Sequence, residues 1–345
     1  MTLNASASLR ADDAAERAAP GNNAPRTRAN VPARLKFAVH GPVVEVENFL
    51  PGLGPHLDRL LGAFSVPSWP DGFLPVHGTV RAYDQADVLR HLSPGARPLP
   101  RVHDLTDVFE DGERFWVVDE RWGMAEINFL KGHWRSWVLP RPQFDALRCA
   151  EMAVLWPLAQ LLRPRGVHLL PAAAAARDGF AFLLVCPFGV EGELNELAGA
   201  GYKLIGRRWT AVREEDGRAA LLHMPAATGR TIARAMGGTI EESDSADGSR
   251  SDPWQNHAFC DAVLIADAVR RPRASLKELP VTAAAGRLRS AWPIAELHPS
   301  RRHSPLPGRL AHLCRCAELQ LSRDPADLLS LLDSLRHMPT AALAA

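Results

Sequence analysis

Lysine is scarce in this chain, because only four of its 40 basic residues are lysines and the rest are arginines. The four are Lys36, Lys131, Lys203 and Lys277. Any chemistry that needs a lysine side chain therefore has very few positions at which to occur.

The chain also has no large excess of positive or of negative side chains. The chain has 40 basic and 39 acidic residues, and neither sign is concentrated in one half of it. A protein that wraps nucleic acid would carry a basic surplus, so no nucleic-acid partner is expected. No stretch of about 18 uncharged apolar residues occurs, so no membrane span is expected.

Cysteine is rare and unpatterned, with five residues and no CxxC spacing. Such a set argues against a disulfide framework and a structural zinc site, and it favours a reducing compartment, so we expect a cytoplasmic protein. The 13 histidines show no HExxH motif and no paired helical spacing, so no metal site is expected either.

The length of 345 residues allows two domains. Residues 1–33 contain almost no large apolar side chains and are expected to be a disordered tail. Residues 34–142 are predicted to form a small antiparallel β-rich domain, residues 143–165 a connecting helix, and residues 166–338 a second domain. The predicted fold class is α/β, α+β overall, ending in two C-terminal helices.

The clearest strands of the first half are Arg114–Glu120, Gly123–Leu130 and His133–Leu139, which together predict an antiparallel meander. Four tryptophans fall in or beside these strands, and a packed sheet face is a better interpretation of them than an aromatic ligand cage. They are Trp116, Trp122, Trp134 and Trp137. The next segment, Gln143–Arg163, has a helical period that Pro157 is expected to kink or divide.

The second half contains an apolar strand, Phe180–Val185, followed by the loop CPFGVEGE and a predicted short helix, Leu194–Ala198. A strand that leads through a glycine-containing loop into a helix is typical of phosphate-binding folds. Further strands are predicted at Tyr202–Ile205, Trp209–Val212 and Ala262–Ile265.

The two terminal helices differ in how clearly they are marked. The last begins at an expected N-cap, Asp324, followed by Pro325. Cys314 and Cys316 are two residues apart on the preceding predicted helix, which would point them to different sides.

The segment Gly166–Val212 resembles the core of the HPr kinase/phosphorylase C-terminal domain and its HPr kinase-related relatives. It has the same order of strand, alanine run, Asp-Gly turn, apolar strand, loop, helix and Gly-Tyr-x-Leu. The resemblance implies a P-loop sheet similar to that of phosphoenolpyruvate carboxykinases, over residues 166–338.

The departures from the family pattern fall on the residues that carry its chemistry. The family's loop supplies a lysine and a Ser/Thr, but here the lysine position falls on Gly192 or Glu193. Arg207 and Arg208 replace the family's acidic pair, and Pro171 replaces its histidine. The remaining residues of the degenerate loop are Cys186, Pro187, Phe188 and Gly189.

The loop gains glutamates, whereas arginines replace the acidic pair, so the two changes are opposite in charge. They lie on elements that are neighbours in the family fold. We therefore expect Glu191 or Glu193 to pair with Arg207 or Arg208, in the place of a nucleotide. The alternative is that all four side chains are simply solvated.

Two functions follow from the resemblance. The first is a non-catalytic, pseudokinase-like protein that binds a peptide or protein partner, in a peptide-modification or secondary-metabolite system, without a cofactor. The second is an enzyme in which Arg207 and Arg208 bind an anionic substrate and Glu191 or Glu193 is the acid or base. ATP and magnesium belong only to the second, and a homo-oligomer is compatible with both.

Overall fold

The computed structural model describes residues 32–67, 75–82, 91–99, 106–119, 121–139, 146–186, 190–224, 255–267, 269–291 and 306–337. The expected tail lies outside these residues except for Pro32 and Ala33, and the first strand begins at Ala33. Pro32–Ala345 forms one compact unit. The domain boundaries near residues 142 and 166 stay predictions.

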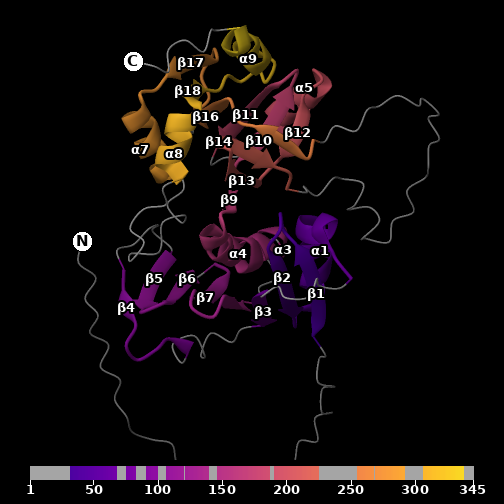
Figure 1. Ribbon diagram of the computed structural model, residues 1–345, viewed down its shortest axis with the longest axis vertical. Coiled ribbons are helices and arrows are strands. Elements are labelled where there is room, and N and C mark those ends of the chain that lie inside the picture. The colour runs from indigo at the N-terminus through magenta and orange to yellow at the C-terminus, as the bar shows by residue number, and fades with distance from the viewer. Residues whose placement is uncertain are drawn as a thin grey trace, which may run out of the picture. The chain divides into compact units, whose positions relative to one another are not determined.

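The first half of the chain forms an eight-stranded sheet in the order β1-β2-β3-β8-β7-β6-β5-β4 (Figure 1). The predicted meander is present as β6, β7 and β8, while β3 pairs in parallel with both β2 and β8. The sheet is therefore mixed, with antiparallel pairing along the meander and at both edges. The strands are β1 Ala33–Ala38, β2 Val43–Asn48, β3 Val76–Ala82, β4 Arg97–Pro98, β5 Thr106–Asp111, β6 Arg114–Asp119, β7 Gly123–Asn128 and β8 His133–Val138.

A close approach between β3 and β8 depends on Gly78. This residue lies opposite Trp134, and a Cβ atom at position 78 would be 2.1 Å from Cζ2 of the Trp134 ring. Trp134 is fully buried, as are Trp116 and Trp122, so the tryptophans of the meander are core residues. The interpretation as a packed sheet face is confirmed.

One interrupted helix covers this sheet. It consists of α3 (Ala146–Ala150), a π-helical turn (Glu151–Leu155) and α4 (Trp156–Leu162). In an α-helix the carbonyl of Ala153 would accept a hydrogen bond from residue 157, but Pro157 has no N–H. Trp134 Nε1 and Ser136 Oγ donate to this carbonyl, at 3.1 and 2.6 Å. The predicted division near Pro157 is present, as a π-helical turn just before it.

Two further sheets form the second half of the chain. The six-stranded sheet has the order β12-β10-β11-β16-β18-β17, and the four-stranded sheet has the order β15-β14-β13-β9. Their strands are β9 His168–Leu170, β10 Ala173–Arg177, β11 Phe180–Val185, β12 Lys203–Gly206, β13 Thr210–Glu215, β14 Arg218–Leu222, β15 His257–Phe259, β16 Ala262–Ala266, β17 Ser275–Glu278 and β18 Arg315–Gln320. The remaining helices are α1 Gly54–Leu61, α5 Glu191–Gly199, α7 Val281–Ala291, α8 Leu306–Leu313 and α9 Asp327–His337, and short 3-10 turns span Pro51–Leu53, Gly62–Phe64 and Arg163–Arg165.

Helices cover both faces of the six-stranded sheet. Ala173 and Ala175 pack with α5 and α9, while Ala174 and Ala176 pack with α7 and α8 on the opposite face. This alternation follows from the two-residue period of a strand. The chain is thus α/β, as predicted, with mixed sheets and helical layers (Figure 1).

The prediction that Cys314 and Cys316 share a helix is wrong. Helix α8 ends at Leu313, and Cys316 lies in β18, which pairs in parallel with β16 and antiparallel with β17. Both cysteines are buried in one core cluster, with Cys314 Sγ donating to the carbonyl of Cys260. The two C-terminal helices are therefore separated by an interior strand of the six-stranded sheet.

The N-cap prediction for the last helix is confirmed in its main feature. Asp324 Oδ1 accepts a hydrogen bond from the N–H of Ala326, and α9 follows from Asp327. Leu328, Leu332 and Leu335 form its buried stripe. None of the helices in the described part of the chain is long and apolar enough to span a membrane.

Candidate functional site

The candidate site lies where β11 leads into α5. Cys186 follows β11 directly and is half-buried, whereas Pro187, Phe188 and Gly189 lie outside the described residues. Helix α5 begins at Glu191, three residues earlier than predicted. Glu191, Gly192 and Glu193 therefore form the first helical turn, where negative side chains interact favourably with the helix dipole.

The turn between β12 and β13 carries Arg207 toward this helix and Arg208 toward the π-helical turn. Gly206 is required at its start, because a Cβ atom there would be 2.3 Å from the carbonyl oxygen of Trp209. Thr210 fixes the other end, since its buried hydroxyl donates to the carbonyl of Ala172 at 2.8 Å. The two arginines are thus presented by a tight and anchored turn.

Arg207 and Glu191 form one of the ion pairs that the sequence predicted. Arg207 Nη1 lies 3.2 Å from Glu191 Oε2, and Arg207 Nη2 donates to Asn195 Oδ1 at 3.3 Å. The Glu191 side chain is 60% exposed and that of Arg207 is 27% exposed. Of the four predicted charged residues, the structure pairs these two with each other.

Glu193 has a partner that the sequence did not indicate. Its side chain is only 1% exposed, and Arg270, from the segment between β16 and β17, donates to Glu193 Oε1. Arg270 also donates to the carbonyl of Ser322 at 3.0 Å. The hydrogen bond with Glu193 raises the pKa of Arg270. Together the two contacts of Arg270 hold α5 to the segment before α9.

Arg208 points to a third carboxylate, on the interrupted helix. Its Nη2 atom lies 3.0 Å from Glu151 Oε2 in the π-helical turn. The Glu151 side chain is 8% exposed, whereas that of Arg208 is 47% exposed. Arg208 therefore keeps much of its guanidinium at the surface while it links the second half of the chain to the first.

These groups meet at one pocket of about 620 Å³, a volume that includes its open mouth. Its charged lining combines α1, the π-helical turn, α5 and the β12–β13 turn. The apolar lining comes from α1, α3, the π-helical turn, the β12–β13 turn and the residue Met224 after β14. The lining residues are Arg59, Leu60, Leu147, Glu151, Leu155, Glu191, Arg207, Arg208, Trp209 and Met224. Glu193 is not among them, so the two predicted glutamates belong to different environments.

The site lacks the groups that phosphoryl transfer would need, within the described residues. Lys203 lies on β12, as predicted, and no lysine lines the pocket. No group of three or more His, Cys, Asp or Glu side chains in the described ranges could hold a metal ion. What the arrangement offers is a set of arginine donors next to apolar surface.

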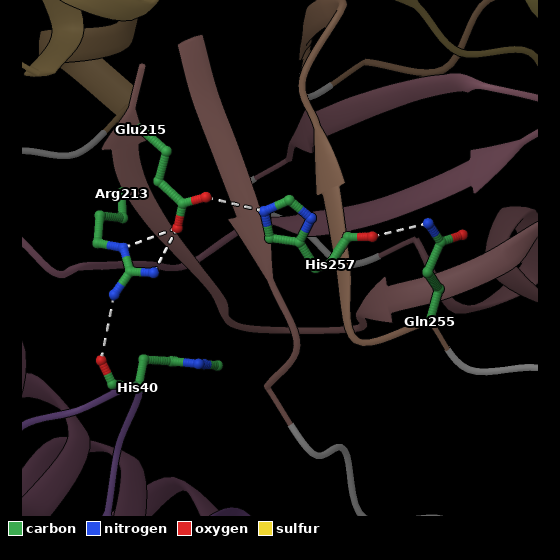
Figure 2. Close-up of polar contacts among 5 residues, drawn as sticks. All are labelled: His40, Arg213, Glu215, Gln255 and His257. Carbon is green, nitrogen blue, oxygen red and sulfur yellow. Dashed lines mark hydrogen bonds and ion pairs between the residues drawn. The ribbon is translucent and has the colours of Figure 1, made fainter. Parts of the chain in front are cut away.

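A second polar cluster joins β13 to the β1–β2 turn. Figure 2 shows the Arg213 side chain between Glu215 and the carbonyl of His40, with His257 on the other side of Glu215. The hydrogen bond from Arg213 lowers the pKa of Glu215, and His257 Nε2 lies 3.0 Å from Glu215 Oε2. Gln255 Nε2 donates to the backbone carbonyl of His257 at 2.7 Å. This cluster connects two sheets.

Sequence reasoning missed three contributors to the candidate site, namely Arg59, Glu151 and Arg270. Their partners or neighbours lie far away in the sequence, so no local pattern could identify them. The only sign of these three residues in the sequence is a charged side chain within an otherwise apolar or loop segment.

The comparisons with known proteins add little to this geometry. No family model matches the chain, and no curated protein does. Among solved structures, the HPr(Ser) kinase/phosphatase from Coxiella burnetii aligns with 49% of this chain and 90% of its own, at 9% identity and a TM-score of 0.28. At this TM-score the likeness carries no conclusion about family, fold or activity.

Proposed function

We propose that this protein binds a peptide or protein partner and does not transfer phosphate. The observation that supports the proposal is the first turn of α5, which carries Glu191 and Glu193 where a phosphate-binding loop would present free amides and a lysine. Both carboxylates are already paired with arginines.

The charges at this helix end oppose a nucleotide. Two like charges about 4 Å apart repel by about 4 kcal/mol at the effective dielectric of a protein surface. A triphosphate at α5 would meet the exposed carboxylate of Glu191, and it would compete with that carboxylate for Arg207. Magnesium and nucleotide have no part in this proposal.

The adjacent pocket supports a partner-binding role. Arginine and tryptophan are enriched among the residues that dominate binding energies at protein interfaces, and Arg207, Arg208 and Trp209 are consecutive in the pocket lining. Both arginines are held by ion pairs, so little side-chain entropy is lost when a partner binds. A peptide of a peptide-modification or secondary-metabolite system is the partner that the sequence resemblance implies.

A random heptapeptide library displayed on phage tests the proposal with the intact protein as bait. We expect enriched peptides that lose binding when Arg207 and Arg208 are both replaced by alanine, and whose binding magnesium and ATP leave unchanged. Failure to enrich any peptide, or enrichment that is indifferent to the double replacement, would contradict it.

A second candidate function is an enzyme of altered chemistry. Glu191 lines the same pocket as Arg207 and Arg208, so an acid or base and two anion-binding groups are together. Glu193 does not fit this role, because it is buried and held by Arg270. Turnover of a small anionic substrate that is abolished by Glu191→Gln, with substrate binding retained, would favour the enzyme.

A further inference from the structure

The charged groups of the pocket do not balance. Three arginines, Arg59, Arg207 and Arg208, face two glutamates, Glu151 and Glu191. Arg207 pairs with Glu191, and Arg208 pairs with Glu151. One positive charge is therefore left over in the described lining.

The unmatched arginine is Arg59 of α1. No carboxylate of the described residues lies within ion-pair distance of it, and its Nε atom is buried without a hydrogen-bond partner there. A guanidinium with an unmatched charge in a half-buried position gains from a bound anion, because the desolvated ion is then paired. Arg59 belongs to α1, which is far from the degenerate loop and α5 in the sequence.

The rest of the lining is apolar. Leu60, Leu155 and Met224 are at most 6% exposed, and Leu147 and Trp209 are half-buried around them. An apolar side chain that covers this surface adds hydrophobic binding energy next to the cationic group. The lining thus matches a ligand with one negative charge and an adjoining apolar group.

We infer that this pocket binds a carboxylate that adjoins an apolar side chain in the peptide partner, with Arg59 as the main charge partner of the carboxylate. The inference rests on the proposed function and names the chemistry of its ligand. One carboxylate neutralises the one unmatched charge. The two negative charges of a phosphate dianion would exceed this single positive charge, and they would be repelled by Glu151 and Glu191.

A matched pair of dipeptides tests the inference on the intact protein. N-acetyl-Leu-Trp with a free carboxylate and the same dipeptide as its amide differ only in the charged group. We expect the acid to bind about tenfold more tightly than the amide, because hydrogen bonds to charged groups contribute on this scale. Arg59→Gln should remove that difference and leave the affinity for the amide unchanged.

The control is Arg114→Gln, which changes an exposed arginine of β6 outside the pocket and should keep the preference for the acid. Equal affinity for acid and amide, or no binding of the acid, would overturn the inference even if Arg59→Gln failed to fold, because the wild-type comparison does not need the variant. If displayed peptides bind through Arg207 and Arg208 without any carboxylate preference, the inference fails and the proposed function stands.

Discussion

Glu191 Oε2 lies 3.2 Å from Arg207 Nη1, so the first turn of α5 is tied to the turn between β12 and β13 by a carboxylate and a guanidinium. The pair brings together the two segments in which the sequence departs most from the phosphate-binding pattern. A second carboxylate of the same helical turn, Glu193, is tied to Arg270. The first turn of α5 therefore carries two carboxylates of the chain itself, each paired with an arginine.

The two ion pairs should differ in their contribution to stability. Arg270→Ala leaves the buried Glu193 carboxylate uncompensated and should lower the free energy of unfolding by about 3 kcal/mol. Arg207→Ala breaks a solvent-exposed pair and should cost less than about 1 kcal/mol. Urea denaturation of both variants measures the difference, and equal losses would show that burial of Glu193 is not decisive.

Gly78 should be intolerant of any side chain. Gly78→Ala places a methyl group on the Trp134 ring and should destabilise the protein by about 3 kcal/mol, because the ring is fully buried and cannot move aside. Gly286→Ala, in α7, is the matched control. Its Cβ atom meets nothing within 4 Å, so the substitution should stabilise by about 0.5 to 1 kcal/mol. Thermal denaturation that gave both variants the same midpoint would contradict the packing described for β3 and β8.

Stability should fall as the pH drops from about 6.5 to about 4. Burial lowers the pKa of His40 and of His168 to about 4 in the folded protein. The unfolded chain binds protons at these residues already near their ordinary pKa of about 6.5, so acid favours unfolding across this window. Each histidine contributes on the order of 3 kcal/mol to this loss.

Urea denaturation at several pH values measures the slope. His40→Asn keeps a residue that tolerates the positive φ of this position and should make the decline with pH shallower. An unchanged slope in the variant would mean that His40 is not protected from protonation in the folded state.

The carbonyl of Ala153 should show coupling between its two side-chain donors. Ser136→Ala alone should cost about 1 kcal/mol, because Trp134 Nε1 still satisfies the carbonyl. Ser136→Ala together with Trp134→Phe leaves it without either donor and should cost more than the sum of the single changes. A double-mutant cycle from denaturation data measures this excess, and strict additivity would argue against a shared acceptor.

Much of the fold could be predicted where the sequence has a strong local period. The strands of the meander and β11 were found because alternation and apolar runs are local signals. Strand β18 has the sequence RCAELQ, which contains no β-branched or aromatic residue, so its local pattern does not indicate a strand. Its pairing with β16 and β17 decides its structure, and pairing between distant segments is not visible in a local pattern.

The candidate site was predictable to a similar degree. Glu191 and Arg207 were expected to meet because the resemblance placed their elements side by side, and they do. Arg208 pairs instead with Glu151, and Glu193 pairs with Arg270. The partners of these two are far away along the chain, so their contacts depend on how the helices and sheets pack.

Calorimetric titration of the intact protein with ATP and magnesium shows whether the first turn of α5 can hold a nucleotide. We expect no heat of binding for the wild-type protein, because the first turn of α5 carries Glu191 and Glu193 and their arginine partners are already engaged. Magnesium-dependent binding of ATP that is lost on substitution of Arg207 or Arg270 would contradict this expectation, since these arginines would then serve a nucleotide and not the helix.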